Sequence, residues 1–281
     1  MSAAPGAARL WGVLGHPYLD VSPLIDTSVF PVLDAELTRG LTRATTNATG
    51  GTLKWMGVVA PWVIDDGFRD AMFAIEAMSP DELREFAALG DGPPVLVEDR
   101  ATWRFGDETD RPFTAAQVRL LSTRYGAYFP WKVCLHLLEN ERWEDKHSGA
   151  GKAFTAEALA LFPETVRFVQ SLPFTEIGRV VLFGLEPDDH APLHRDTEPG
   201  RALQVAQSLC FQPRPGKRLY LQNAPEAAPT IVDAPLYWFN DMDYHGVLSD
   251  PVFRYSVRVD GVFDRDFVRS IERHARSQAT P

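Results

Sequence analysis

The sequence predicts a mainly β fold with flanking helices, in the form of a double-stranded β-helix, or jelly roll. From Gly178 onward, short β-branched and apolar runs alternate with turn-forming residues at the spacing of strands. Within this region His194 and Asp196 stand two residues apart, and 51 residues separate His194 from a further histidine, His245. That separation suits three or four intervening strands of a jelly roll.

Length and composition limit the class of protein. The chain has 281 residues, of which 45% are hydrophobic, so it can bury a large core. A net charge of −10 argues against a nucleic acid as partner. No apolar run reaches the roughly 18 residues of a transmembrane helix, and no signal peptide is evident, so we expect no membrane association and a cytoplasmic location. Cys134 and Cys210 are expected to remain reduced thiols.

Residues 1–150 are predicted to form a mixed α/β region that flanks the barrel and contributes to a substrate pocket. Helical spacing of apolar residues covers Phe30–Arg43. Two further helices begin at residues that can cap them, over Ser79–Leu89 and Thr114–Tyr125. Apolar and aromatic residues predict a strand over Tyr128–Leu138, and a short strand or buried loop over Leu53–Ile64.

Residues 151–281 are predicted to form the jelly-roll core and a C-terminal helix. Thr155 caps a helical pair that is interrupted near Pro163. The helix at the end of the chain is expected over Asp264–Ser277. The strands are expected over Arg179–Leu185, His190–Asp196, Ala202–Phe211, Lys217–Gln222, Pro235–Phe239 and Val252–Val259.

His194, Asp196 and His245 are the candidate metal ligands. On an extended strand, residues i and i+2 point to the same side, so His194 and Asp196 can reach one metal ion together. His245 would come from a separate strand. Two histidines and one carboxylate can occupy one face of an octahedral ferrous ion and leave the other positions open for a co-substrate and O₂.

Arg254 lies nine residues after His245, inside the predicted strand Val252–Val259. A guanidinium can grip a carboxylate at two points, such as the far carboxylate of a keto acid that chelates the metal. Strand alternation places Ser256 and Arg258 on the same face as Arg254. Ser256 could assist through a hydrogen bond. Arg258 is an alternative candidate for this carboxylate, or could meet a substrate carboxylate or pair with an acid.

At these residues the sequence resembles the iron(II)/2-oxoglutarate-dependent oxygenases, most nearly the bacterial proline hydroxylases and the aspartyl/asparaginyl β-hydroxylase-like group. The resemblance covers residues 164–266 and implies a cupin-like fold with Fe(II), 2-oxoglutarate and O₂. Arg254 would hold the far carboxylate of 2-oxoglutarate, and Ser208 falls close to a polar co-substrate contact. The residues that carry the resemblance are His194-Arg195-Asp196, Trp238–Asp241, His245, Arg254 and Asp260–Asp264.

The resemblance implies a dioxygenase that hydroxylates an unactivated C–H bond of an amino acid or peptidyl side chain and releases succinate and CO₂. Asp196 favours hydroxylation over halogenation, because halogenating relatives lose this carboxylate to make room for halide. Arg258 and His190 are candidates for substrate contact, although His190 lies about 13 Å along the strand from His194 at about 3.3 Å per residue.

Two alternative functions stay open. One is a cupin-like metalloenzyme of the isomerase type that uses no 2-oxoglutarate, and the other is a non-catalytic jelly-roll binding module. The sequence leaves open the substrate and the carbon attacked, whether the substrate is free or peptidyl, whether the product is hydroxylated or desaturated, and the oligomeric state.

Overall fold

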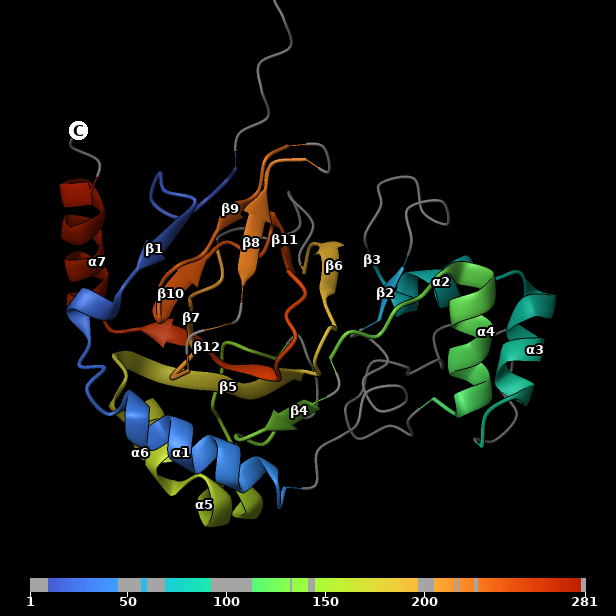
Figure 1. Cartoon of the computed structure of the whole chain (residues 1–281), viewed down its shortest axis with the longest axis horizontal. Coiled ribbons are helices and arrows are strands. Elements are labelled where there is room, and N and C mark those ends of the chain that lie inside the picture. Colours follow the sequence, from blue (N-terminus) through green and yellow to red (C-terminus); the bar gives the residue numbers. More distant parts are fainter. Residues whose placement is uncertain are drawn as a thin grey trace, which may run out of the picture.

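A computed structural model of the protein describes residues 10–44, 57–59, 69–91, 113–131, 133–140, 145–196, 205–214, 216, 218–224 and 227–278. Most of these residues form one β-rich body with helices on its outside, and a smaller helical lobe lies beside it (Figure 1). No helix in the described ranges combines the length and the apolar character that crossing a bilayer requires.

The larger sheet of the body has six antiparallel strands in the order β1-β10-β7-β12-β5-β4. The longest pairing joins β12 to β5 along nearly their whole length. The strands are β1 (Tyr18–Asp20), β4 (Val133–His136), β5 (Phe174–Leu185), β7 (Ser208–Phe211), β10 (Leu236–Phe239) and β12 (Arg254–Phe263).

The smaller sheet has four antiparallel strands in the order β6-β11-β8-β9. Along the chain, β5 to β12 pass back and forth between the two sheets, which is the course of a jelly roll. The predicted mainly β fold with flanking helices is therefore confirmed. The strands of this sheet are β6 (Ala191–His194), β8 (Leu219–Gln222), β9 (Thr230–Ile231) and β11 (Tyr244–Val247).

The central strand β12 separates two environments. Tyr255, Val257 and Val259 belong to a hydrophobic core shared with the outer helices. Arg254 and Arg258 alternate with these residues and therefore point to the other face, between the two sheets. The predicted alternation along this strand is confirmed, and it brings two arginines into the interior of the barrel.

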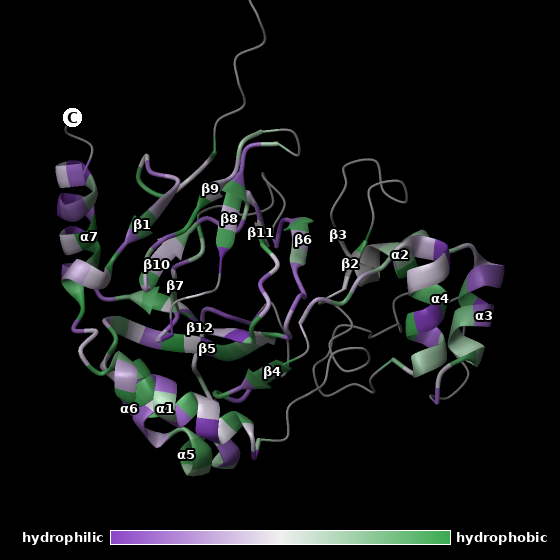
Figure 2. Cartoon of the chain, in the orientation of Figure 1, coloured by the Kyte–Doolittle hydropathy of each residue, from purple (hydrophilic) through white to green (hydrophobic). Residues whose placement is uncertain are grey.

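Helices cover the outer face of the six-stranded sheet. Each carries both hydrophobic and hydrophilic residues (Figure 2), as expected for helices that bury one side. The buried Glu36 joins two of them, because its carboxylate accepts hydrogen bonds from the amides of Glu164 and Thr165 at 2.8 Å each. The helices are η1 (Ser22–Leu24), α1 (Phe30–Leu41), α5 (Ala156–Leu161), α6 (Pro163–Ser171) and α7 (Arg265–Gln278).

The smaller lobe has its own hydrophobic core around Phe86, Phe113 and Leu121. Capping boxes start two of its helices, at Ser79 and at Thr114, as the sequence predicted. Its elements are β2 (Val58–Val59), β3 (Arg69–Asp70), α2 (Ala71–Ala77), α3 (Pro80–Ala88) and α4 (Ala115–Tyr125).

The predicted boundaries hold better for helices than for strands. The predicted helices over Phe30–Arg43 and Asp264–Ser277 correspond closely to α1 and α7. Among the strands, β5 begins at Phe174 and β12 continues to Phe263, so both are longer than predicted. The strand predicted over Tyr128–Leu138 shortens to β4, and β9 was not predicted.

Parts of some predicted segments lie outside the described residues. This applies to most of the segment predicted over Leu53–Ile64, and to residues 202–204 of the strand predicted before Phe211. Within the predicted N-terminal region of residues 1–150, β1 and β4 are strands of the six-stranded sheet and α1 covers that sheet.

Candidate metal centre

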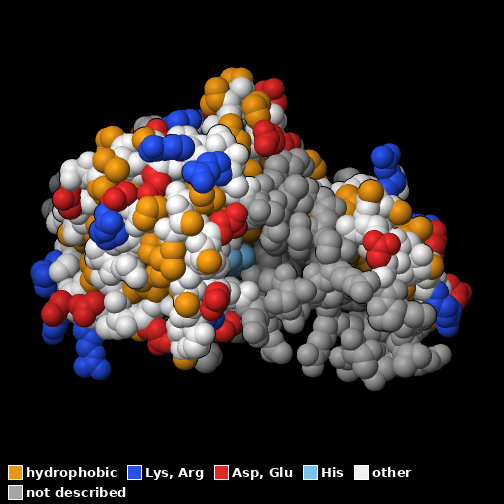
Figure 3. Space-filling view, turned by 90° about the horizontal axis from the view of Figure 1, so that it is seen from below, with side chains coloured by type: hydrophobic (Ala, Val, Ile, Leu, Met, Phe, Trp, Pro, Cys, Tyr) orange, Lys and Arg blue, Asp and Glu red, His pale blue; other side chains and the backbone are white. Residues whose placement is uncertain are grey.

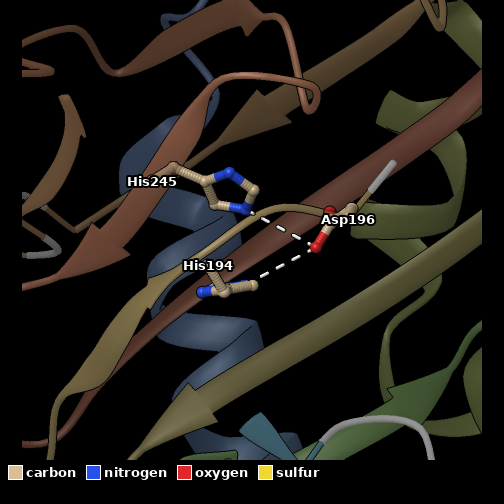
Figure 4. Close-up of side chains that lie close together, drawn as sticks. All are labelled: His194, Asp196 and His245. Atoms are coloured by element: carbon tan, nitrogen blue, oxygen red, sulfur yellow. Dashed lines mark ion pairs between the residues drawn. The ribbon is translucent and has the colours of Figure 1, made fainter. Parts of the chain in front are cut away.

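His194, Asp196 and His245 lie together at one end of the barrel interior (Figure 4). Their ligand atoms all lie within 4.8 Å of one another. Oδ1 of Asp196 is 3.5 Å from Nε2 of His194 and 3.5 Å from Nε2 of His245. The pairing of β6 with β11 explains this meeting, because His245 lies directly opposite His194 in the register.

Asp196 reaches the site differently from the strand alternation that the sequence predicted. β6 ends at His194, so Asp196 lies beyond the strand and does not reach the site by strand alternation. Its backbone amide instead donates to the carbonyl oxygen of Asp241 at 3.1 Å, and this hydrogen bond holds Asp196 close to the two histidines. The side chains of His194 and Asp196 still converge, because the backbone of Asp196 is bonded to the segment that follows β10.

Both histidine rings are oriented by backbone carbonyls. The Nδ1 of His194 lies 2.7 Å from the carbonyl oxygen of Pro192, and the Nδ1 of His245 lies 2.9 Å from that of Asp243. A carbonyl oxygen can only accept, so each Nδ1 carries the hydrogen. In the neutral rings the lone pair is then on Nε2, the atom that faces Asp196.

The electrostatics of Asp196 favour the charged carboxylate. Burial raises its pKa, but His245, Arg258 and His194 outweigh burial and hold the pKa well below its ordinary value. Its side chain is 22% exposed. Histidine atoms show at the surface of the barrel body, with acidic side chains above and below them in this view (Figure 3). An ionised carboxylate beside two imidazoles in their neutral form is a donor set suited to Fe(II).

Arg258 binds three carboxylates at once. Its Nη1 donates to Oδ2 of Asp196 at 2.9 Å, its Nη2 to Asp241 at 3.0 Å and its Nε to Asp260 at 2.9 Å. The sequence left open whether Arg258 meets a co-substrate carboxylate, meets a substrate carboxylate or pairs with an acid. In the structure it pairs with acidic residues of the chain. Its guanidinium is therefore already engaged on all three nitrogens.

Two further cations complete this buried network. Lys146 donates to Asp241 at 3.0 Å, and Arg179 donates to Asp260 at 2.8 Å. Sequence reasoning missed both residues and the role of Asp241. The alternation of Arg258 and Asp260 on the inward face of β12 was the available signal, because buried charges need partners.

Arg254 lies four residues before Arg258 on the same inward face. Its Nη1 donates to the carbonyl oxygen of Leu248, and its Nη2 donates to that of Asp189 at 2.7 Å. Its Nε is buried without a hydrogen-bond partner among the described residues. At about 3.3 Å per residue, its Cα lies about 13 Å along the strand from that of Arg258.

Ser208 and Ser256 lie at different depths in the barrel. Ser256 is buried on β12 between the two arginines. Ser208 pairs in register with Asp260, six residues from Arg254, and its Oγ is buried without a hydrogen-bond partner in the described part of the chain. The Cα atoms of Asp260 and Arg254 are about 20 Å apart along the strand. One five-carbon diacid cannot bridge that distance, so Ser208 and Arg254 would contact different parts of the site.

His190 lies just before β6 and is exposed. Its ring stacks on Tyr128, with ring centroids 5.1 Å apart. The hydroxyl of Tyr128 donates to Asp189 at 2.8 Å. The structure therefore places His190 in an exposed position against Tyr128, and it does not belong to the group formed by the three candidate ligands.

Comparison with known proteins gives similarity to solved structures alone. No family model matches the chain, and no curated protein matches it. This chain is similar to a 2OG-Fe(II) oxygenase family protein from Burkholderia pseudomallei. The aligned region covers 52% of this chain and 75% of that protein, with 12% identity and a TM-score of 0.30.

Two prolyl hydroxylases are also similar. A prolyl-4-hydroxylase from Pseudomonas putida matches 39% of this chain and 66% of its own, with 16% identity and a TM-score of 0.25. A prolyl hydroxylase from Trichoplax adhaerens, solved with a peptide fragment of the hypoxia inducible factor oxygen degradation domain, matches 44% of this chain and 61% of its own. Its identity is 15% and its TM-score 0.26.

Proposed function

We propose that this protein is an iron(II)- and 2-oxoglutarate-dependent dioxygenase that hydroxylates a C–H bond of an amino acid or peptidyl side chain. The observation that carries the proposal is the distance of 3.5 Å from Oδ1 of Asp196 to Nε2 of each histidine. Two oriented imidazoles and an ionised carboxylate at one end of a jelly roll fit a ferrous ion that keeps positions open.

The protein residues would bind and orient the reactants. Iron(II), 2-oxoglutarate and O₂ together supply the oxidising chemistry, with succinate and CO₂ as by-products. His194, Asp196 and His245 would hold the metal, and the carbonyls behind each imidazole keep the rings in place. Arg254 would hold the far carboxylate of 2-oxoglutarate, with Ser256 beside it. Nε of Arg254 has no hydrogen-bond partner among the residues that the structure describes, which supports this role, since a buried cationic donor favours an anion.

A cavity of about 500 Å³ lies between the N-terminal segment and the strands β8 and β9, and we propose that it takes the substrate. Its lining includes Trp11 and Pro17 from the N-terminal segment, Leu221 from β8 and Thr230 from β9. The lining residue Leu221 lies directly opposite His245 in the register of β8 and β11, whereas the three candidate metal ligands are not among the residues that line the cavity. Because residues near the N-terminus form part of the wall, the N-terminal region would contribute to the substrate pocket.

One observation favours the alternative of a metalloenzyme that uses no 2-oxoglutarate. Nη1 and Nη2 of Arg254 already donate to the carbonyl oxygens of Leu248 and Asp189. An arginine with these contacts could serve only to tie the loop after β11 to the loop before β6. The dioxygenase needs Arg254 to bind 2-oxoglutarate, whereas the isomerase-type metalloenzyme does not use 2-oxoglutarate.

The decisive experiment follows succinate formation from 2-oxoglutarate with iron and ascorbate, over a screen of amino acids and peptides. We expect one substrate to couple succinate formation to a mass gain of one oxygen. In Arg254→Ala we expect the KM for 2-oxoglutarate to rise about 10- to 100-fold, since a charge-assisted hydrogen bond contributes about 1.5–3 kcal/mol. Binding of Mn(II) should stay unchanged.

Arg214→Ala is the matched control, because this arginine pairs with Asp34 on the helix side of the sheet. It should leave the KM for 2-oxoglutarate unchanged. Metal binding without any 2-oxoglutarate turnover, together with an Arg254→Ala variant that behaves like the control, would favour the isomerase-type alternative. Absence of metal binding would contradict both enzymes.

A further inference from the structure

The two oxygens of Asp196 have different surroundings. Oδ1 faces both histidine Nε2 atoms at 3.5 Å, whereas Oδ2 accepts a hydrogen bond from Nη1 of Arg258 at 2.9 Å. A carboxylate can bind a metal ion through one oxygen or through both. In this structure one oxygen is turned toward the ligand set and the other is already taken by a cation.

Asp196 needs such a contact because its strand does not hold it. β6 ends at His194, and the side chain of Asp196 is 22% exposed. The backbone amide of Asp196 donates a hydrogen bond to the carbonyl oxygen of Asp241. A carboxylate in that position can rotate about its side-chain bonds unless another group fixes it.

Arg258 is held firmly enough to fix it. Its side chain is 7% exposed, and its three nitrogens bind carboxylates from three separate segments of the chain. The guanidinium carbon also lies 5.9 Å from the centroid of the Phe239 ring, which in turn contacts the ring of His245 edge-on at 5.1 Å. A planar guanidinium with these contacts has one orientation available.

The charges around Arg258 balance. Three carboxylates face Arg258, those of Asp196, Asp241 and Asp260. Lys146 also pairs with Asp241, and Arg179 also pairs with Asp260. A buried ion cluster of this kind is tolerated when each charge has a partner. Arg258 therefore has no unmatched charge for a substrate carboxylate, and its one contact with the ligand set is Oδ2 of Asp196.

We propose that Arg258 is a positioning residue of the metal centre, which holds Oδ2 of Asp196 so that this carboxylate binds the metal through Oδ1 alone. An octahedral ion has six positions, and three protein atoms then leave three open. A chelating keto acid needs two of these and O₂ needs one. If Asp196 bound the metal through both oxygens, only two positions would stay open, one fewer than the keto acid and O₂ together need. This inference rests on the metal centre of the proposed function.

The test counts the exchangeable waters on Mn(II), used as a probe for iron, by the broadening of its EPR lines in ¹⁷O-enriched water. We expect three waters on the wild-type protein without co-substrate. We expect the Arg258→Met variant to lose one of them, because Oδ2 is released to the metal. Arg258→Lys, which keeps the charge but not the planar fork, should lose the same water if orientation is what matters.

Lys146→Met is the matched control. It also replaces a cation of the network with methionine, but Lys146 contacts Asp241 and not Asp196. It should keep three waters. If the Arg258→Met variant does not fold, the water count of the wild-type protein and of Arg258→Lys still decides the question.

Two waters on the wild-type protein, or three on every Arg258 variant, would overturn the role of Arg258 while leaving the metal centre intact. Failure of the wild-type protein to bind Mn(II) would overturn the proposed function as well. Three waters on the wild-type protein and two on Arg258→Met, with no turnover of 2-oxoglutarate, would support Arg258 as a positioning residue and contradict the dioxygenase.

Discussion

At the scale of single residues, the position after His245 has no room for a side chain. A Cβ on Gly246 would lie 2.6 Å from the hydroxyl oxygen of Tyr220 and 2.7 Å from the carbonyl oxygen of Ala191. β11 pairs with β8 on one side and with β6 on the other, so it cannot move away from both. The placement of His245 therefore depends on a glycine that takes no part in metal binding.

Gly246→Ala is expected to shift β11 and to pull His245 out of line with His194. Overpacking of this kind costs about 1–3 kcal/mol of the free energy of unfolding. We expect the Kd for Mn(II) to rise about 10-fold or more, because displaced ligands weaken metal binding as a lost supporting contact does. Urea unfolding and Mn(II) titration would measure the two effects. Unchanged metal affinity would mean that Tyr220 and β6 move to make room for the new methyl group without displacing His245.

Part of the site could be predicted from residue types and spacing. His194, His245 and Asp196 were identified because two imidazoles and a carboxylate form a recognisable donor set. The partners of Arg258 could not be identified in this way, since Asp196 and Asp241 come from distant segments that meet only in the fold. Ser208 was predicted as a co-substrate contact from the family resemblance alone, and its register opposite Asp260 could not be predicted from the sequence, because that register depends on how β7 pairs with β12.

At the scale of elements, Glu36 couples α1 to the start of α6. Its carboxylate accepts from the amides of Glu164 and Thr165 at 2.8 Å and from the Thr165 hydroxyl at 2.7 Å. The first amides of a helix lack partners within the helix, so a carboxylate from another helix can satisfy them. Glu36 is thus a capping group supplied from a distance of more than a hundred residues along the chain.

Glu36→Ala is expected to lower the free energy of unfolding by about 3 kcal/mol. The change leaves buried donors unpaired, and hydrogen bonds to a charged group contribute about 1.5–3 kcal/mol each. Chemical denaturation would measure the loss. As a control, Arg84→Ala removes an exposed ion pair with Asp81 and should change stability by less than about 1 kcal/mol. Equal effects of the two substitutions would rule out the capping role.

Helix boundaries were predictable because their signals are local. Ser79 with Glu82 and Thr114 with Gln117 form capping boxes within four residues of sequence. Strand boundaries depend instead on the partner strand. The pairing of β7 with β12 begins only where Ser208 meets Asp260, and β6 stops where His194 meets His245. No local pattern in the sequence marks those points.

At the scale of the whole molecule, the network around Arg258 ties the two sheets together. Asp260 is fully buried in the six-stranded sheet, and Asp196 follows a strand of the other. Burial raises the pKa of Asp260, but Arg179, Arg258 and Lys146 outweigh burial and bring the pKa below its ordinary value. The folded protein therefore favours the charged form of this carboxylate.

A lowered pKa makes stability depend on pH in a definite direction. Asp260 contributes stability above its unfolded pKa of about 3.9, and this contribution is lost as the pH falls through the lower folded pKa. We expect the urea midpoint of the metal-free protein to fall steeply below about pH 4. Asp260→Asn should be less stable at pH 7 and should lose part of that slope. A parallel slope in the two proteins would contradict the role given to Asp260.

The far edge of the six-stranded sheet is closed by the last helix. Helix α7 lies beside β1 (Figure 1). The Nε2–H of His274 in α7 donates to the carbonyl oxygen of Asp20 in β1 at 2.8 Å, and the Nε2–H of His16 donates to that of Ala275 at 2.9 Å. A bare strand edge is a template for pairing with another chain. A chain shortened to end at Asp264 should therefore self-associate through β1, which light scattering would detect as a concentration-dependent increase in mass.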